Sequence, residues 1–159
     1  METQANRYYL DGADMWLTYG LGVESGSDDF LKLPKRKESI TRNWLDENGI
    51  DVDTSRVFLE AKEIELQCHI IAANEADFWQ KYNRLLAVLS LPGQRRMTVA
   101  EFGQDFFLIY QSCSVYKRFT RLKQASVVAC KLTLKFLEMF PVNNPQLYIV
   151  DEENRFIVT

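Results

Sequence analysis

A strict alternation of apolar and polar residues between Leu59 and Ala73 constrains the fold more than any other feature of the sequence. The apolar members are Ile64, Leu66, Cys68, Ile70 and Ala72, and the polar members are Glu63, Glu65, Gln67 and His69. Successive side chains of a strand point to opposite faces of a sheet, so a period of two predicts a strand with one buried face and one wet face. Such a strand is typical of an antiparallel sheet that is solvated on one side.

Shorter alternating or apolar segments, separated by turn residues, predict further strands. They are Tyr8 to Leu10, Asp14 to Val23, Ser39 to Trp44, Ile50 to Val52, Met97 to Phe102, Asp105 to Gln111 and Ser126 to Phe136. The dipeptides Asp11-Gly12 and Asn48-Gly49 readily adopt the positive φ angles of tight hairpins. These patterns together predict a mainly β, antiparallel domain.

A single helix is expected at about Glu75 to Ser90. Asn74 can cap its first turn, and apolar residues follow at helical spacing. They are Phe78, Trp79, Tyr82, Leu85, Leu86 and Leu89. We expect this stripe to cover an open side of the β core and to bury Leu86.

The segment from Glu24 to Lys37 is interpreted as a long irregular loop. It is rich in Gly, Ser and Asp at first and basic near Pro34, so it contains little apolar surface to offset the entropy of ordering. We expect it to be mobile in an isolated chain and to become ordered against a neighbouring molecule.

Length and composition fit one compact domain. The chain has 159 residues, of which 47% are hydrophobic, and its formal net charge is −3. We expect the domain to span 1–140 and to be followed by an extension, 141–159, that contains a short hairpin. An acidic chain argues against a dedicated nucleic-acid binder. The three cysteines are interpreted as reduced thiols, and neither a signal peptide nor a membrane span is predicted.

No local motif specifies catalysis, a cofactor or a metal. His69 is the only histidine and has no nucleophile arranged around it in the sequence, so it is interpreted as a solvated side chain. The acidic segment from Asp46 to Asp53 lacks the glycine that an EF-hand loop requires at position six. Gly20-x-Gly22-x-x-x-Gly26 is one residue too long for a dinucleotide-binding loop. We therefore expect neither an enzyme nor a bound cofactor or metal ion.

An ordered series of short segments resembles phage tail proteins of Bacteroides-type prophages. The segments are Tyr9-Leu-Asp-Gly12, Trp16-Leu-Thr-Tyr-Gly20, Leu33-Pro-Lys-Arg-Lys-Glu38, Trp44-Leu-Asp-Glu-Asn-Gly-Ile-Asp-Val-Asp53, Glu75-Ala-Asp-Phe-Trp79 and Leu91-Pro-Gly93. More broadly, the chain is similar to the N-terminal ring domain of the distal tail proteins of long-tailed phages. The resemblance covers about Arg7 to Phe140.

The resemblance implies a fold, an assembly and a location. The fold is an antiparallel β-sandwich or barrel of the tail-tube type, with one flanking helix. The assembly is a ring, commonly a hexamer, in which sheets of neighbouring subunits join side by side and DNA passes through the lumen without being held. Its partners are further copies of the chain and other phage tail proteins, with no membrane. The location is the host bacterial cytoplasm during assembly and then the tail of the virion.

Two groups of residues are candidates for the assembly surfaces. The basic run Lys32, Lys35, Arg36 and Lys37 is a candidate docking loop, although such a run is equally compatible with a solvated loop. The polar face Glu63, Glu65, Gln67 and His69, or alternatively Lys131, Thr133 and Lys135, is a candidate channel lining or intersubunit surface. A monomeric ligand- or carbohydrate-binding β-barrel and a hydrolase built from distant residues remain as alternatives.

Overall fold

One antiparallel sheet of seven strands organises the chain. A computed structural model describes residues 7–141. The elements are β1 (Tyr8–Leu10), β2 (Ala13–Asp14), α1 (Met15–Tyr19), β3 (Leu21–Ser25), α2 (Asp28–Leu31), β4 (Thr41–Arg42), β5 (Asp51–Val52), β6 (Lys62–Ala72), α3 (Glu75–Leu89), β7 (Arg95–Val99), β8 (Gln104–Arg118) and β9 (Val128–Glu138). The strand order is β2-β1-β7-β8-β9-β6-β3, and every pairing in it is antiparallel. This arrangement confirms the expected mainly β class.

Strand β8 belongs to both halves of the sheet. Its residues 104–108 pair with β7, whereas 109–118 pair with β9. The register shifts between Tyr110 and Ser112 and again between Cys113 and Val115. Such bulges bend a strand and increase its twist, which lets one strand pass from one half of the sheet to the other. The sequence predicted only the first part of this strand.

The core draws on both halves of the sheet, and helix α3 adds Phe78 and Leu85 to it. The inward residues of β6 and β9, which include Leu66 and Phe136, are buried, as the alternation predicted. The Asn74 side chain caps α3 by accepting a hydrogen bond from the Asp77 amide at 2.9 Å. The expectation for Leu86 was wrong, because Leu86 is 51% exposed whereas its neighbour Leu85 is 4% exposed. Successive helical residues are about 100° apart, so the stripe is wider than the surface that the sheet offers.

The predicted strand from Asp14 to Val23 is wrong in its first half, which forms helix α1. The Asp14 carboxylate accepts hydrogen bonds from the amides of Trp16 and Leu17 at 2.9 and 3.0 Å, and Gly20 ends the helix at φ 62°. Met15 and Tyr19 are buried, and they are four residues apart. Residues four positions apart lie on one face of a strand and also on one face of a helix. The apolar pattern of this short segment therefore fitted both.

The expected loop from Glu24 to Lys37 is also partly wrong. Strand β3 extends to Ser25, and helix α2 begins at Asp28, after Gly26 and Ser27. Phe30 of α2 is 2% exposed, and its ring centroid lies 4.6 Å from that of Phe106. This single aromatic residue supplies the apolar burial that the composition of the segment did not indicate, so α2 packs onto the body of the molecule.

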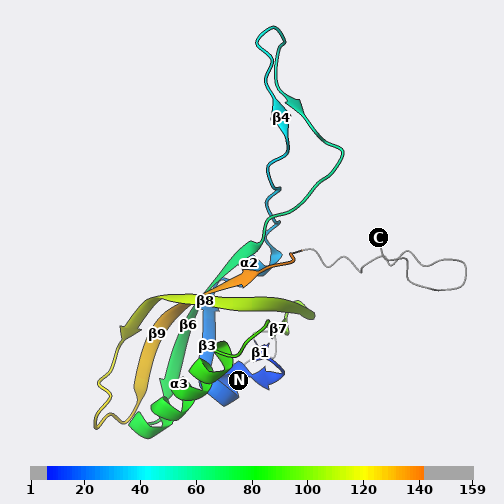
Figure 1. Cartoon of the computed structure of the whole chain (residues 1–159). Coiled ribbons are helices and arrows are strands. Elements are labelled where there is room, and N and C mark those ends of the chain that lie inside the picture. The colour runs from blue at the N-terminus through cyan, green and yellow to red at the C-terminus, as the bar shows by residue number, and fades with distance from the viewer. Residues whose placement is uncertain (1–6, 142–159) are drawn as a thin grey trace, which may run out of the picture.

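A long arm formed by residues 33–61 rises from one end of the sheet (Figure 1). Strands β4 and β5 pair near its tip, with Thr41 opposite Val52. The chain reverses through 43–50, which contains Asn48-Gly49 as predicted, but only Gly49 has a positive φ, so the expected tight hairpin does not form. Backbone hydrogen bonds join the two sides of the arm lower down, from Lys37 N to Phe58 O and from Glu60 N to Lys35 O, both at 2.8 Å. Every residue from 40 to 58 is exposed. The arm is therefore a ribbon without a core.

A buried ion pair fastens the base of the arm to the body. Lys62 Nζ lies 2.9 Å from Glu138 Oε2, and the two side chains are 9% and 10% exposed. Lys62 Nζ also donates a hydrogen bond to the Phe30 carbonyl at 2.6 Å. Glu138 Oε2 makes no well-aligned hydrogen bond, so its contact with Lys62 is a charge pair. The cation thereby links α2, where the chain enters the arm, to the end of β9.

The expected C-terminal hairpin, Leu147 to Val150 with Arg155 to Val158, lies outside the described residues. The division of the chain at 140/141 stays a prediction. Within 7–141, no helix is long and apolar enough to cross a membrane.

Candidate functional site

The two alternative polar faces proposed from the sequence are one and the same face of the sheet. Glu65 lies opposite Lys135 in the β6–β9 register, and in the same way Gln67 lies opposite Thr133 and His69 opposite Lys131. Directly opposed residues of an antiparallel pair share a face. We call these residues, together with Glu63 and with Glu24 of β3, the polar sheet face. Thr133 is only 5% exposed, so this candidate lining residue offers almost no surface to a partner.

The polar sheet face is a mosaic of both charges. Lys131 Nζ lies 2.8 Å from Glu24 Oε2, and Lys135 Nζ lies 3.4 Å from Glu65 Oε2. The hydrogen bond from Lys131, and then its charge, lower the pKa of the Glu24 carboxyl group. Both pairs are partly exposed, so each contributes little to stability. They give the face a pattern of charge that a complementary surface can recognise.

His69 is a half-buried side chain rather than the solvated one that the sequence suggested. Its ring lies against that of Trp16, edge to face, with centroids 6.0 Å apart. It also lies over Gly22 of β3, where a Cβ atom would come within 2.5 Å of His69 Nε2. Gly22 is thus needed for the close packing of His69 on β3. In the sequence, that glycine is part of a pattern that does not fit a dinucleotide-binding loop.

The outer part of β8 presents an open edge. Residues 109–118 pair with β9 on one side, while β7 reaches only to Leu108 on the other. Within the part of the chain that the structure describes, the second side of 109–118 has no partner strand. All residues from 111 to 118 are exposed. Unpaired strand edges favour pairing with another chain.

The basic residues of the predicted docking loop lie at the start of the arm, and all four are exposed. Lys32 directly follows α2, and Lys35 reaches across the arm to Glu60, with Nζ 3.8 Å from Oε2. The Arg36 guanidinium donates to the Ser39 hydroxyl at 3.1 Å, and Lys37 begins the next stretch of the arm. We call these four residues the basic stem.

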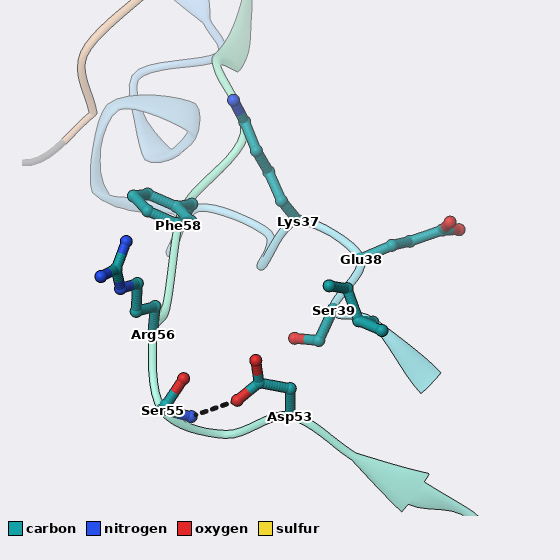
Figure 2. A pocket seen from close by; sticks show the side chains of 8 residues that line it. Lys37, Glu38, Ser39, Asp53, Ser55, Arg56 and Phe58 are labelled. Atoms are coloured by element: carbon teal, nitrogen blue, oxygen red, sulfur yellow. Dashed lines mark hydrogen bonds between the residues drawn. The ribbon is translucent and has the colours of Figure 1, made fainter. Parts of the chain in front are cut away.

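A cavity of about 490 Å³ opens between the two sides of the arm. Figure 2 shows Lys37, Glu38 and Ser39 on one side and Arg56 and Phe58 on the other. At its end the Asp53 carboxylate accepts a hydrogen bond from the Ser55 amide at 2.9 Å, and hydrogen bonding to Ser55 lowers the pKa of Asp53. The cavity is open and carries both charges. Its lining therefore offers another molecule charged side chains of both signs together with the apolar ring of Phe58.

The three cysteines are free thiols, as expected from the sequence. Burial raises the pKa of the Cys68 thiol to about 12 and raises that of Cys130 as well. Both thiols therefore stay protonated and unreactive near neutral pH. Among residues 7–141, no three His, Cys, Asp or Glu side chains come together as a set of metal ligands.

An apolar groove of about 260 Å³ lies between α3 and the outer half of the sheet. Leu86, Tyr82 and Leu89 line it from the helix, and Tyr110 and Tyr116 line it from β8. Helix α3 covers the β6 side of the sheet and leaves this β8 side open.

Sequence reasoning overlooked the connection between β8 and β9, where basic residues flank Phe119. The signal was present as a run of charge from Lys117 to Lys123 that contains no acidic residue. The segment lies between the strands predicted up to Gln111 and from Ser126, so it was not assigned to any element.

The fold is similar to that of a phage tail protein. The crystal structure of the Dit (gp 19.1) protein of phage SPP1, described as a paradigm of the hub adsorption apparatus in phages that infect Gram-positive bacteria, aligns with a TM-score of 0.57 at 17% sequence identity. The alignment covers 85% of this chain and 50% of the SPP1 protein, so this chain spans about half the length of that protein. No protein-family model and no curated protein matches the chain.

Proposed function

We propose that this chain is a structural subunit of a phage tail that assembles into a ring around a DNA-conducting channel. The observation that carries the proposal is the likeness of 85% of the chain to the distal tail protein of SPP1. The assignment to Bacteroides-type prophages and the hexameric state stay predictions from the resemblance in the sequence.

Open sheet edges support side-by-side assembly. In the half-sheet β8-β9-β6-β3, the outer part of β8 is one edge and β3 is the opposite edge. Pairing of the β8 edge of one copy with the β3 edge of the next would use a different surface on each partner. A repeated contact of this heterologous kind closes into a ring when the rotation between copies allows it.

In such a ring the polar sheet face is proposed to line the lumen or an intersubunit surface. Each of its two lysines pairs with a carboxylate, Lys131 with Glu24 and Lys135 with Glu65, and Glu63 adds a further negative charge. Such a face in an acidic subunit has no excess positive charge to retain phosphates, which suits DNA that passes without being held.

The basic stem is proposed to dock on an acidic surface of a neighbouring subunit or of another tail protein. Lys32 and Lys37 make no ion pair with an acid among residues 7–141, and Lys35 makes only the long contact of 3.8 Å with Glu60. Exposed charges at the rim of an interface chiefly set the association rate and its dependence on salt. We propose that this chain and its partner tail proteins assemble in the bacterial cytoplasm and then remain in the tail of the virion.

A monomeric ligand-binding barrel is the less favoured function. The sheet ends at β2 on one side and β3 on the other, and these two strands do not pair in the described structure. An open sheet does not enclose a ligand cavity as a closed barrel does.

The direct test is light scattering combined with negative-stain imaging of the purified chain over a range of concentrations. We expect a discrete oligomer whose images are rings with an open centre. A chain that remains monomeric at every concentration, alone and with other proteins of its tail, would contradict the proposal.

The docking role of the basic stem has a separate test. The variant Lys35→Glu, Arg36→Glu, Lys37→Glu should keep the wild-type melting temperature, because exposed charges contribute little to stability, but it should assemble more slowly at low salt. Equal assembly rates of variant and wild type across a salt series would show that the stem is only solvated.

A further inference from the structure

The connection between β8 and β9 forms a basic surface with an exposed aromatic residue. We call residues 117–123 the basic loop; its charged members are Lys117, Arg118, Arg121 and Lys123. None of these four makes an ion pair with an acid in the described part of the chain. Phe119 is 60% exposed, and Lys117 Nζ lies 5.8 Å from the centroid of its ring. A shallow hollow of about 440 Å³ is lined by residues 118–123.

The tip of the arm has the opposite charge and is also apolar. We call residues 44–53 the arm tip; its charged members are Asp46, Glu47, Asp51 and Asp53, with no basic residue among them. Within 7–141 these carboxylates make no ion pair either. Trp44 is 51% exposed, and Leu45 and Ile50 are exposed beside it. Large apolar side chains on an exposed acidic turn are the composition of a contact surface.

The basic loop and the arm tip lie at opposite ends of the long strands. Strand β9 starts next to the basic loop and ends at Glu138, beside Lys62 at the base of the arm. Its 11 residues span about 36 Å at the usual rise of a strand. Figure 1 shows the arm extending away from the body at that end, with the β8–β9 connection at the other. The two surfaces therefore do not meet within one copy.

We propose that the arm tip of one copy docks on the basic loop of a second copy and joins the copies head to tail along the direction of the long strands. Four carboxylates meet four cations, and Trp44 and Leu45 pack against Phe119 and into the hollow beside it. The apolar contact supplies binding energy, whereas the charges select the partner and the orientation. This inference rests on the proposed assembly and adds to it a contact between rings, distinct from the edge-to-edge contact within a ring.

The proposed partner is a second copy of this chain, because the two surfaces complement each other. The arm tip carries the same number of charges as the basic loop, with the opposite sign, and it adds apolar side chains that a phosphate backbone cannot match. A contact between opposite ends of the chain is heterologous and does not close after two copies, so rings would stack into short tubes.

Two charge-reversal variants test the contact. One changes the arm tip, Asp46→Lys, Glu47→Lys, Asp51→Lys, and leaves Asp53 because that side chain is held by Ser55. The other changes the basic loop, Arg118→Glu, Arg121→Glu, Lys123→Glu. Each variant should keep the wild-type melting temperature, and each alone should lower stacking by about tenfold or more at low salt, because like charges now face each other.

Rescue separates a direct contact from an indirect effect. An equimolar mixture of the two variants should stack again, because each reversed surface finds its complement on the other variant. A chain that carries both reversals should also stack. The control variant Arg7→Glu, Arg84→Glu, Arg96→Glu changes three exposed cations elsewhere by the same charge as the basic-loop variant and should stack like the wild type.

Negative-stain side views and sedimentation velocity at about 0.05 M and about 0.5 M salt distinguish the outcomes. Single rings from each variant, with stacks restored in the mixture, support the proposal. Unchanged stacking in both variants, or no rescue by mixing, overturns it while leaving the ring intact. Head-to-tail chains without rings would support the contact and contradict the proposed ring, whereas a wild-type chain that never associates contradicts both. If the wild type binds a short DNA duplex, and the basic-loop variant does not bind it but stacks like the wild type, the basic loop would be assigned to nucleic-acid binding instead.

Discussion

The body of the sheet and the arm differ in what holds them in place. In the body, the inward faces of β6 and β9 remove residues such as Ile64 and Phe136 from water almost completely. In the arm, Leu45 and Trp44 are exposed, and only short strands and a few backbone hydrogen bonds keep its two sides together. Burial of apolar surface is the main term that offsets conformational entropy on folding, and the arm has almost none of it.

The difference in burial separates residues that stabilise the fold of the single chain from residues that are available for contact with another molecule. A two-stranded ribbon alone is marginally stable in water. The arm nevertheless contains exposed apolar residues at its tip, including Leu45 and Ile50, which a purely solvated ribbon does not need. We infer that substitutions in the body act on stability, whereas substitutions in the arm act on association.

The largest effect is expected at the buried ion pair that anchors the arm. Glu138→Ala leaves the Lys62 cation buried without its counter-charge and should lower the free energy of unfolding by about 3 to 5 kcal/mol. The matched change in the arm, Glu60→Ala, removes the exposed partner of Lys35. It should change the free energy of unfolding by less than about 1 kcal/mol. Urea unfolding of both variants measures the difference. Equal losses would mean that the pair at the base is not buried as described.

Two adjacent leucines of α3 test where the body ends. Leu85→Ala should cost about 2 to 5 kcal/mol because it removes a buried side chain and leaves a cavity. Leu86→Ala should cost less than about 1 kcal/mol because Leu86 is half exposed and faces the apolar groove. Thermal unfolding should place these variants in that order, and a reversed order would show that α3 is rotated about its axis.

A smaller, pH-dependent effect is expected at the start of α3. The Asp77 carboxylate accepts hydrogen bonds from Lys81 Nζ at 2.8 Å and from the Ala73 amide at 2.9 Å, and these contacts lower its pKa below the ordinary value of 3.8. A lowered folded-state pKa stabilises the fold above pH 3.8, and this contribution is lost as the pH falls through the folded pKa. Asp77→Asn keeps an acceptor oxygen but loses the negative charge that strengthens these hydrogen bonds. It should therefore be less stable than the wild type near neutral pH, by about 1 kcal/mol, and should approach the wild type at low pH.

The control for Asp77 is Glu75→Gln, which removes a charge from the same turn but no hydrogen bond seen in the structure. Near neutral pH, the free energy of unfolding of Glu75→Gln should differ from that of the wild type by less than that of Asp77→Asn does. Urea unfolding at several pH values measures both variants, and a gap between Asp77→Asn and the wild type that widens toward low pH would contradict the assignment.

The smallest effect on stability is expected at the arm tip. Leu45→Ser should leave the melting temperature unchanged because Leu45 makes no buried contact in the single chain. The same change should weaken association between copies, since it removes apolar surface from the proposed contact. Sedimentation velocity and thermal unfolding of the same samples measure both properties. A loss of thermal stability in the monomer would show that the arm packs on its own body.

Local patterns in the sequence predicted the elements whose neighbours lie close in the chain. The alternation of β6, the cap and stripe of α3 and the turn at Asn48-Gly49 each depend on a few consecutive residues. Helix α1 was missed because Met15 and Tyr19 fit both a period of two and a period near four. Helix α2 was missed because Phe30 is buried by the distant Phe106, a contact that no local pattern reports.

The candidate surfaces depended even more on long-range pairing. The sequence offered β6 and β9 as separate polar faces, and only their register shows that Glu65 and Lys135 lie side by side. Lys62 carried no sign that it would pair with Glu138, because 76 positions separate them in the chain. The basic loop, in contrast, was visible in the sequence as a charge run, but its position at the far end of the long strands from the arm was not.

The most direct test of the division between body and arm is the mass in solution of two chains, the wild type and one in which 40–53 is replaced by a short Gly-Ser turn. Multi-angle light scattering over a concentration series gives both masses, and thermal unfolding of the same samples reports the body. We expect the wild type to form a discrete oligomer that grows further at low salt, and the shortened chain to lose this growth while keeping the melting temperature of the wild type. A shortened chain that associates like the wild type, or that unfolds at a much lower temperature, would contradict the assignment of the arm to contacts between copies.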